Sequence, residues 1–147
     1  HADPEVRRIV GEGDVLLPKI RTTRAKLLQA IQAVDEALLY DALSHQQDCG
    51  WGDTAGMVGH DAVHTGRTLY GWVQNLTREA RQAVKALEIE PTQAVVDGCD
   101  EIGLRIPELE PLREFLALPK NRQILRQRDA AVALGNYARA VALSTSH

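Results

Sequence analysis

The most constraining feature of this 147-residue chain is a regular spacing of small and apolar residues between positions 55 and 87. These residues alternate at steps of four and three, and they are Ala55, Gly59, Ala62, Gly66, Leu69, Val73, Leu76, Ala80, Ala83 and Leu87. Such spacing gathers them on one face of a helix, while the opposite positions are polar. The pattern predicts one long helix over about 54–88.

A second apolar seam precedes this helix and predicts a partner helix over about 14–49. The seam consists of Leu17, Ile20, Leu27, Ile31, Val34 and Leu38. Gly50 is expected to cap the helix, and the short connection through Trp51 and Gly52 predicts that the two helices form an antiparallel hairpin.

The same register places three polar residues in the apolar seam of the helix predicted over 14–49 and three apolar residues on its outer face. Arg24, Asp41 and His45 fall in the seam, so they are expected to point inward and to need partners there. A neighbouring set is left on the outer face as an exposed apolar patch, and it comprises Leu39, Tyr40 and Leu43. This patch predicts contact with another element or another protein.

The remaining sequence predicts shorter helices only. Their expected ranges are 4–10, 91–103, 108–118 and 119–143, with Gly11 and Gly13 ending the first. No period-two strand pattern, internal repeat or low-complexity linker is evident. We therefore predict an all-α antiparallel helical bundle, built on the long hairpin and forming one domain over residues 1–147.

Composition excludes several classes of protein. The net charge is −3 with acids and bases interspersed, so the composition argues against nucleic acid as the main partner. No apolar run approaches the roughly 20 residues of a membrane span, and the first residues do not resemble a signal peptide. Cys49 and Cys99 are too few for a disulfide framework, and a single bridge between them stays open. We expect a soluble, cytoplasmic protein, with a processed secreted form as the alternative.

Two groups of potential metal ligands stand out. His60 and His64 have the i, i+4 spacing of helical metal sites, although the seam register places both on the polar face. Asp41, His45 and Cys49 follow one another at steps of four. Zinc would suit this combination of imidazole, thiolate and carboxylate. The alternative is that Asp41 and His45 hydrogen-bond each other and fix the hairpin register, with Cys49 as a small apolar residue.

Four basic residues crowd the first turns of the last predicted helix, where the helix dipole disfavours cations. They are Lys120, Arg122, Arg126 and Arg128. A counter-charge is implied, supplied either by the acidic segments around Asp97–Glu101 and Glu108–Glu114 or by an anionic partner.

No nucleophile elbow, phosphate-binding glycine loop or cofactor fingerprint is present, and we predict no catalytic residue.

The leading hypothesis is a non-enzymatic helical protein-interaction or assembly module that self-associates. Its contacts would come from the Leu39, Tyr40 and Leu43 patch and the four basic residues. The competing hypothesis is a sensory bundle that binds a metal or ligand through Asp41, His45 and Cys49 with His60 and His64. A third hypothesis is an enzyme with Asp41 and His45 as an acid–base pair.

Overall fold

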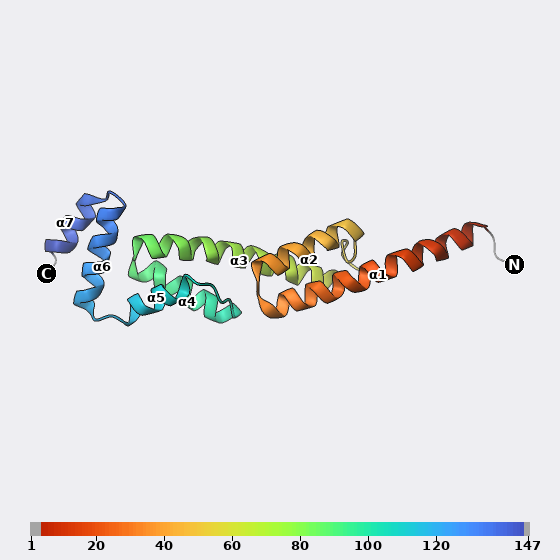
Figure 1. The fold of residues 1–147 in the computed structure, drawn as a ribbon, viewed down its shortest axis with the longest axis horizontal. Helices are drawn as coiled ribbons and strands as arrows, with labels where there is room; N and C mark the ends of the chain where they lie inside the picture. Colours follow the sequence, from red (N-terminus) through yellow and green to blue (C-terminus); the bar gives the residue numbers. More distant parts are fainter. Residues whose placement is uncertain (1–3, 146–147) are drawn as a thin grey trace. The chain divides into compact units, whose positions relative to one another are not determined.

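A computed structural model describes the backbone of residues 4–145 and the side chains of residues 18–145. Within that range the chain forms helices and no strand, which confirms the all-α prediction (Figure 1). The helices are α1 (Pro4–Ala33), α2 (Glu36–Cys49), α3 (His60–Ala86), α4 (Ile89–Ile102), α5 (Leu109–Ala117), α6 (Lys120–Ala133) and α7 (Tyr137–Thr145). None of the helices in the described residues is both long and apolar enough to span a membrane.

The chain divides into two compact units, with the division inside α3. Unit 1 runs through Val73 and contains α1, α2 and the first part of α3. Unit 2 begins at Gln74 and contains the rest of α3 together with α4 to α7. The assignment of residues 1–147 to one domain stays a prediction.

The predicted helix over 14–49 is wrong, because the chain turns at Val34 and Asp35 and forms two helices. Val34 takes a left-handed backbone conformation with φ 50°. The Asp35 side chain then caps α2 by accepting a hydrogen bond from the Leu38 backbone N–H at 2.9 Å. As a result α2 doubles back along α1 (Figure 1). The predicted stop at Gly11 and Gly13 is also wrong, since α1 continues through both glycines.

This turn shifts the buried face of α2 by one residue from the predicted seam. A continuous helix would have buried positions 38, 41 and 45, but the buried residues are Leu39, Ala42 and Gln46. Leu39 is completely buried. The predictions that Leu39 is exposed and that Asp41 and His45 point inward are therefore wrong.

The seam of α3 is confirmed from Ala62 onward, where Gly66, Val73, Ala80 and Ala83 are buried. Gly66 faces the Leu27 side chain of α1, and a Cβ atom at Gly66 would lie 2.7 Å from Leu27 Cδ1. The absence of a side chain at this glycine thus leaves room for the Leu27 side chain of α1. The predicted start at residue 54 is wrong, because residues 50–59 form a loop and the helix begins at His60.

Unit 2 is a series of sequential helices around a small apolar core. Fully or nearly fully buried side chains include Val95, Val96, Cys99, Leu104, Leu109, Leu112, Phe115 and Ala131. On its surface Arg113 pairs with Asp100, with Nη1 3.2 Å from Oδ2, and this ion pair holds the pKa of Asp100 below its usual range. The predicted final helix over 119–143 is split, because Gly135 takes φ 76° and separates α6 from α7.

Candidate interaction groove

The loop between α2 and α3 is built from consecutive tight turns. Gly50 ends α2 in the left-handed conformation, and its N–H donates to the Gln46 carbonyl at 2.7 Å, which confirms the predicted cap. Further turns are closed by Met57 N–H to the Thr54 carbonyl at 3.0 Å and by His60 N–H to the Met57 carbonyl at 3.2 Å. The backbone of this loop is therefore internally hydrogen-bonded.

Two glycines let the loop fold tightly on itself. Gly52 and Gly59 both have positive φ, at 66° and 87°. A Cβ atom on Gly52 would lie 2.6 Å from the carbonyl carbon of Gly59, and a Cβ atom on Gly59 would overlap the indole ring of Trp51. Any larger residue at either position would separate the two ends of the loop or displace the tryptophan.

A polar network fastens the loop to the helices. The buried Gln46 side chain donates from Nε2 to the Trp51 carbonyl at 3.0 Å and to Asp53 Oδ1 at 3.1 Å. Arg67 of α3 donates from Nη2 to Gln46 Oε1 at 3.1 Å and to Asp53 Oδ1 at 3.0 Å. The hydrogen bonds from Gln46 and Arg67 hold the pKa of Asp53 below its usual range. Asp53 thus binds the loop as a carboxylate.

His60 adds a second attachment at the start of α3. Its Nδ1 lies 2.9 Å from the carbonyl oxygen of Gly52, so Nδ1 carries the proton and donates it. The imidazole of His64, one turn later, is stacked on His60 with ring centroids 6.3 Å apart. The conspicuous His60 therefore serves the loop as a structural donor.

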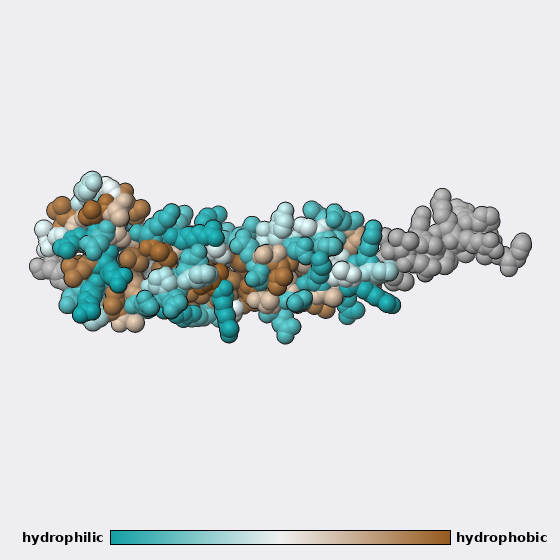
Figure 2. Space-filling view, viewed as in Figure 1, coloured by the Kyte–Doolittle hydropathy of each residue, from teal (hydrophilic) through white to brown (hydrophobic). Residues whose placement is uncertain are grey.

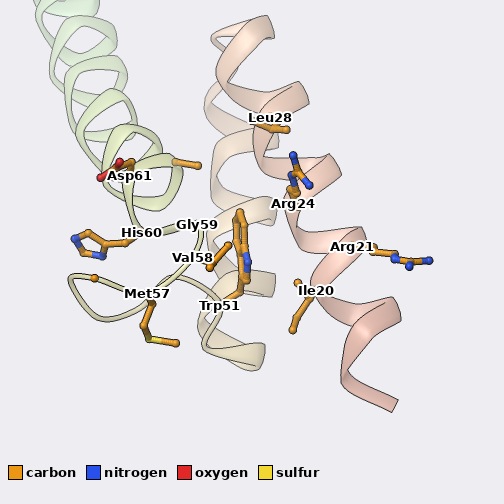
Figure 3. A pocket seen from close by; sticks show the side chains of 12 residues that line it. Ile20, Arg21, Arg24, Leu28, Trp51, Met57, Val58, Gly59, His60 and Asp61 are labelled. Atoms are coloured by element: carbon orange, nitrogen blue, oxygen red, sulfur yellow. The ribbon is translucent and has the colours of Figure 1, made fainter. Parts of the chain in front are cut away.

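Between this loop and α1 lies a groove of about 730 Å³ (Figure 3). One wall is a face of α1, with Ile20, Arg24 and Leu28 at successive helical turns. The other wall is the loop and the start of α3, and Trp51 stands between the two walls beside Val58 (Figure 3). The volume is in the range of natural binding sites.

The loop presents apolar side chains to solvent at this groove. Val58 is 86% exposed and Met57 is 47% exposed, while the Trp51 side chain beside them is half-buried. Val58 is the most exposed of the large apolar side chains in the described residues, and it lies next to Met57 at the edge of the groove, so the two present apolar surface there together. Sequence reasoning missed Met57 and Val58, although their position between Gly56 and Gly59 marks a turn rather than a helix.

Charges at the groove are divided between its walls. Arg21 and Arg24 lie on α1, and Asp61 lies on α3. All three are exposed, and among the side chains of residues 18–145 none of them forms an ion pair. By contrast, the nearby basic residues Lys26 and Arg67 are paired with Asp41 and Asp53.

The predicted metal ligands lie apart from this groove, except for His60. Lys26 of α1 contacts Asp41 and His45 at once, with its Nζ 3.0 Å from Asp41 Oδ2 and 3.0 Å from His45 Nε2. The hydrogen bond from Lys26 lowers the pKa of Asp41. Both residues are exposed on α2. They help to join α1 to α2, although through a lysine rather than through each other.

Cys49 is half-buried at the end of α2, with Sγ 3.5 Å from Thr23 Oγ1. Both cysteines are free thiols. Within the described part of the chain, no three His, Cys, Asp or Glu side chains come close enough together to hold a metal ion.

The predicted partner patch on α2 is dispersed by the register shift. Leu39 is buried and Leu43 is half-buried. Tyr40 remains exposed, and the centroid of its ring lies 6.4 Å from the centroid of the Tyr70 ring. Of the three residues, only Tyr40 is exposed, as the predicted partner-binding patch requires.

The four basic residues predicted for partner binding lie on α6, where Lys120, Arg122 and Arg126 are exposed and Arg128 is half-buried. They form no ion pair with any side chain in residues 18–145. Of the two predicted sources of counter-charge, the internal one is therefore absent within ion-pair distance in those residues, and the anionic partner stays a prediction. Apolar residues are also visible on the surface around α6 and α7 (Figure 2). The exposed ones are Leu125 and Val132 of α6, Leu134 directly after it, and Tyr137 and Val141 of α7.

Comparisons with known proteins leave the family open. No protein-family model matches the chain, and no solved structure matches it. The chain is 28% identical over 129 residues to a protein of Acanthamoeba castellanii described as the high molecular weight form of myosin-1. This similarity spans 88% of the chain but only 8% of that protein's length.

Proposed function

We propose that this chain is a non-enzymatic helical module that binds another protein through the groove beside Trp51. The observation that carries the proposal is the apolar loop surface, where Val58 and Met57 are exposed next to the half-buried indole. Contiguous exposed apolar side chains favour association, because covering them removes apolar surface from water.

The way the loop is held also supports a binding role. The hydrogen bonds of Gln46 on α2 and of Arg67 and His60 on α3 hold it before any partner binds. A pre-formed site loses less conformational entropy on binding than a flexible one. Aromatic and methionine side chains are enriched at the centres of protein interfaces, and the groove offers one of each.

Site-directed photo-cross-linking tests this proposal. A benzophenone side chain replaces Val58, whose exposure makes the substitution tolerable, and a matched control carries the same group at Gln47, an exposed position of α2 outside the groove. The full chain is irradiated in an extract of the cells that produce it. We expect discrete protein adducts from position 58 that position 47 does not give.

An adduct of twice the chain's mass would identify a second copy as the partner, as self-association requires. The same adducts from both positions, or no protein adduct from position 58, would contradict the proposal.

Under the alternative metal-binding hypothesis, the stacked pair His60 and His64 supplies the ligands. Because Nδ1 of His60 donates its proton to the Gly52 carbonyl, the other ring nitrogen, Nε2, faces away from that bond and is available to bind a metal. A further ligand would have to come from another molecule, and zinc titration in solution tests this alternative.

A further inference from the structure

We infer that the partner of the groove is an acidic amphipathic helix, which inserts apolar side chains beside Trp51 and places carboxylates against Arg21 and Arg24. This inference rests on the proposed function and specifies its ligand. It is carried by the shape of the α1 wall and by the two arginines on it.

The shape of the groove favours a helix over a compact small molecule. Ile20, Arg24 and Leu28 are four residues apart, so this wall follows one helical face over about 12 Å. Two to three turns of a second helix would match that length, and their apolar positions would meet Ile20, Leu28 and the indole. Helix-in-groove docking commonly uses apolar anchors at i, i+4 and i+7.

The charges specify the flank of the incoming helix. In Figure 3 Arg24 lies along α1 near Leu28, and Arg21 points from α1 to the side away from Trp51, so both lie on the α1 flank of the groove. Neither has a carboxylate partner in residues 18–145. Lys26, two residues further along α1, is already paired with Asp41 and is not available to a partner. Acidic residues along the flank that faces α1 would satisfy both guanidinium groups. Asp61 on the opposite wall disfavours acids on the other flank.

Two synthetic helical peptides test the inference. Both carry leucines at i, i+4 and i+7, and one has glutamates along one flank where the other has lysines. Trp51 emission reports binding to the full chain in a Trp72→Phe background, which leaves Trp51 as the sole tryptophan. We expect the glutamate peptide to bind about three- to tenfold more tightly at low salt, with the preference shrinking as salt is added. The variant Arg21→Glu/Arg24→Glu should reverse the preference.

Other outcomes overturn the inference without deciding the proposed function. Equal affinity for the two peptides, or an unchanged preference in the double variant, would remove the role of the arginines while leaving the groove as a protein-binding site. If neither peptide changes the Trp51 emission at millimolar concentration, the helical occupant is wrong, and photo-cross-linking at position 58 still decides the proposed function. Dimers that Val58→Asp abolishes would instead name a second copy as the occupant.

Discussion

The indole of Trp51 occupies the space that a side chain at Gly59 would need. Gly59 combines this contact with a left-handed backbone at φ 87°, so both its missing Cβ atom and its conformational freedom are used. The pair joins the start of the loop to its end and sets the position of the tryptophan in the groove.

Gly59→Ala should therefore destabilise unit 1 and displace Trp51. We expect a loss of about 1–3 kcal/mol, from positive φ and from overlap with the ring. The matched control is Gly71→Ala in α3, where an added Cβ atom meets nothing within 4 Å. That substitution should be neutral or stabilising by up to about 1 kcal/mol. Thermal unfolding measures both, and equal effects would show that the Gly59 contact is unimportant.

Acid should loosen the loop through Asp53. Because the folded-state pKa of Asp53 is lowered, its stabilising contribution is fully present above the unfolded value of about 3.9. The contribution is lost as the pH falls through the folded-state pKa. We expect Trp51 emission, read in Trp72→Phe protein, to shift to the red below about pH 4. Asp53→Asn should weaken this pH dependence and Asp41→Asn should not, so an identical titration in all three proteins would contradict the assignment.

The two cysteines should differ in reactivity. Cys99 is completely buried in unit 2, and burial raises the pKa of its thiol, whereas Cys49 is half-buried at the end of α2. Alkylation requires an accessible thiolate. We expect iodoacetamide to modify Cys49 first and Cys99 only after unfolding, as followed by mass spectrometry with Cys49→Ser as the control. Comparable rates in the native protein would show that the core of unit 2 opens readily.

Zinc should bind weakly if the chain acts through protein contacts alone. Protein purified without a histidine tag should retain less than about 0.1 equivalents of transition metal after incubation with zinc and removal of the excess. His60→Ala/His64→Ala provides the control for surface binding by the stacked pair. Stoichiometric zinc that this double variant loses would favour the metal-binding hypothesis over the proposed one.

The sequence predicted the helical class and the α3 seam because both depend on local periodicity. It failed where a turn reset that periodicity. The residues after Ala33 still fit the seam spacing, yet Asp35 caps a new helix, and one residue of shift exchanges buried and exposed positions along α2. The prediction for Leu39 and His45 was wrong for this reason. A left-handed Val34 is disfavoured for a β-branched residue, so spacing alone could not reveal the turn.

The candidate site was only partly predictable. The Gly50 cap followed from local rules, and His60, which lines the groove, was among the predicted site residues. The role of Gly59 could not be predicted from local rules. Its spacing fits a helical seam, and its contact with Trp51 depends on the path of the loop. Gln46 was equally hidden, since it becomes buried only in the shifted register of α2.

The most direct test of the groove as a protein-binding site is the yield of cross-linked partner from position 58 relative to position 47, measured with and without Gly59→Ala. The proposed function predicts a partner adduct specific to position 58, which falls when Gly59→Ala displaces Trp51. Equal yields from the two positions, or a position-58 adduct that Gly59→Ala leaves unchanged despite a shifted Trp51 emission, would contradict it.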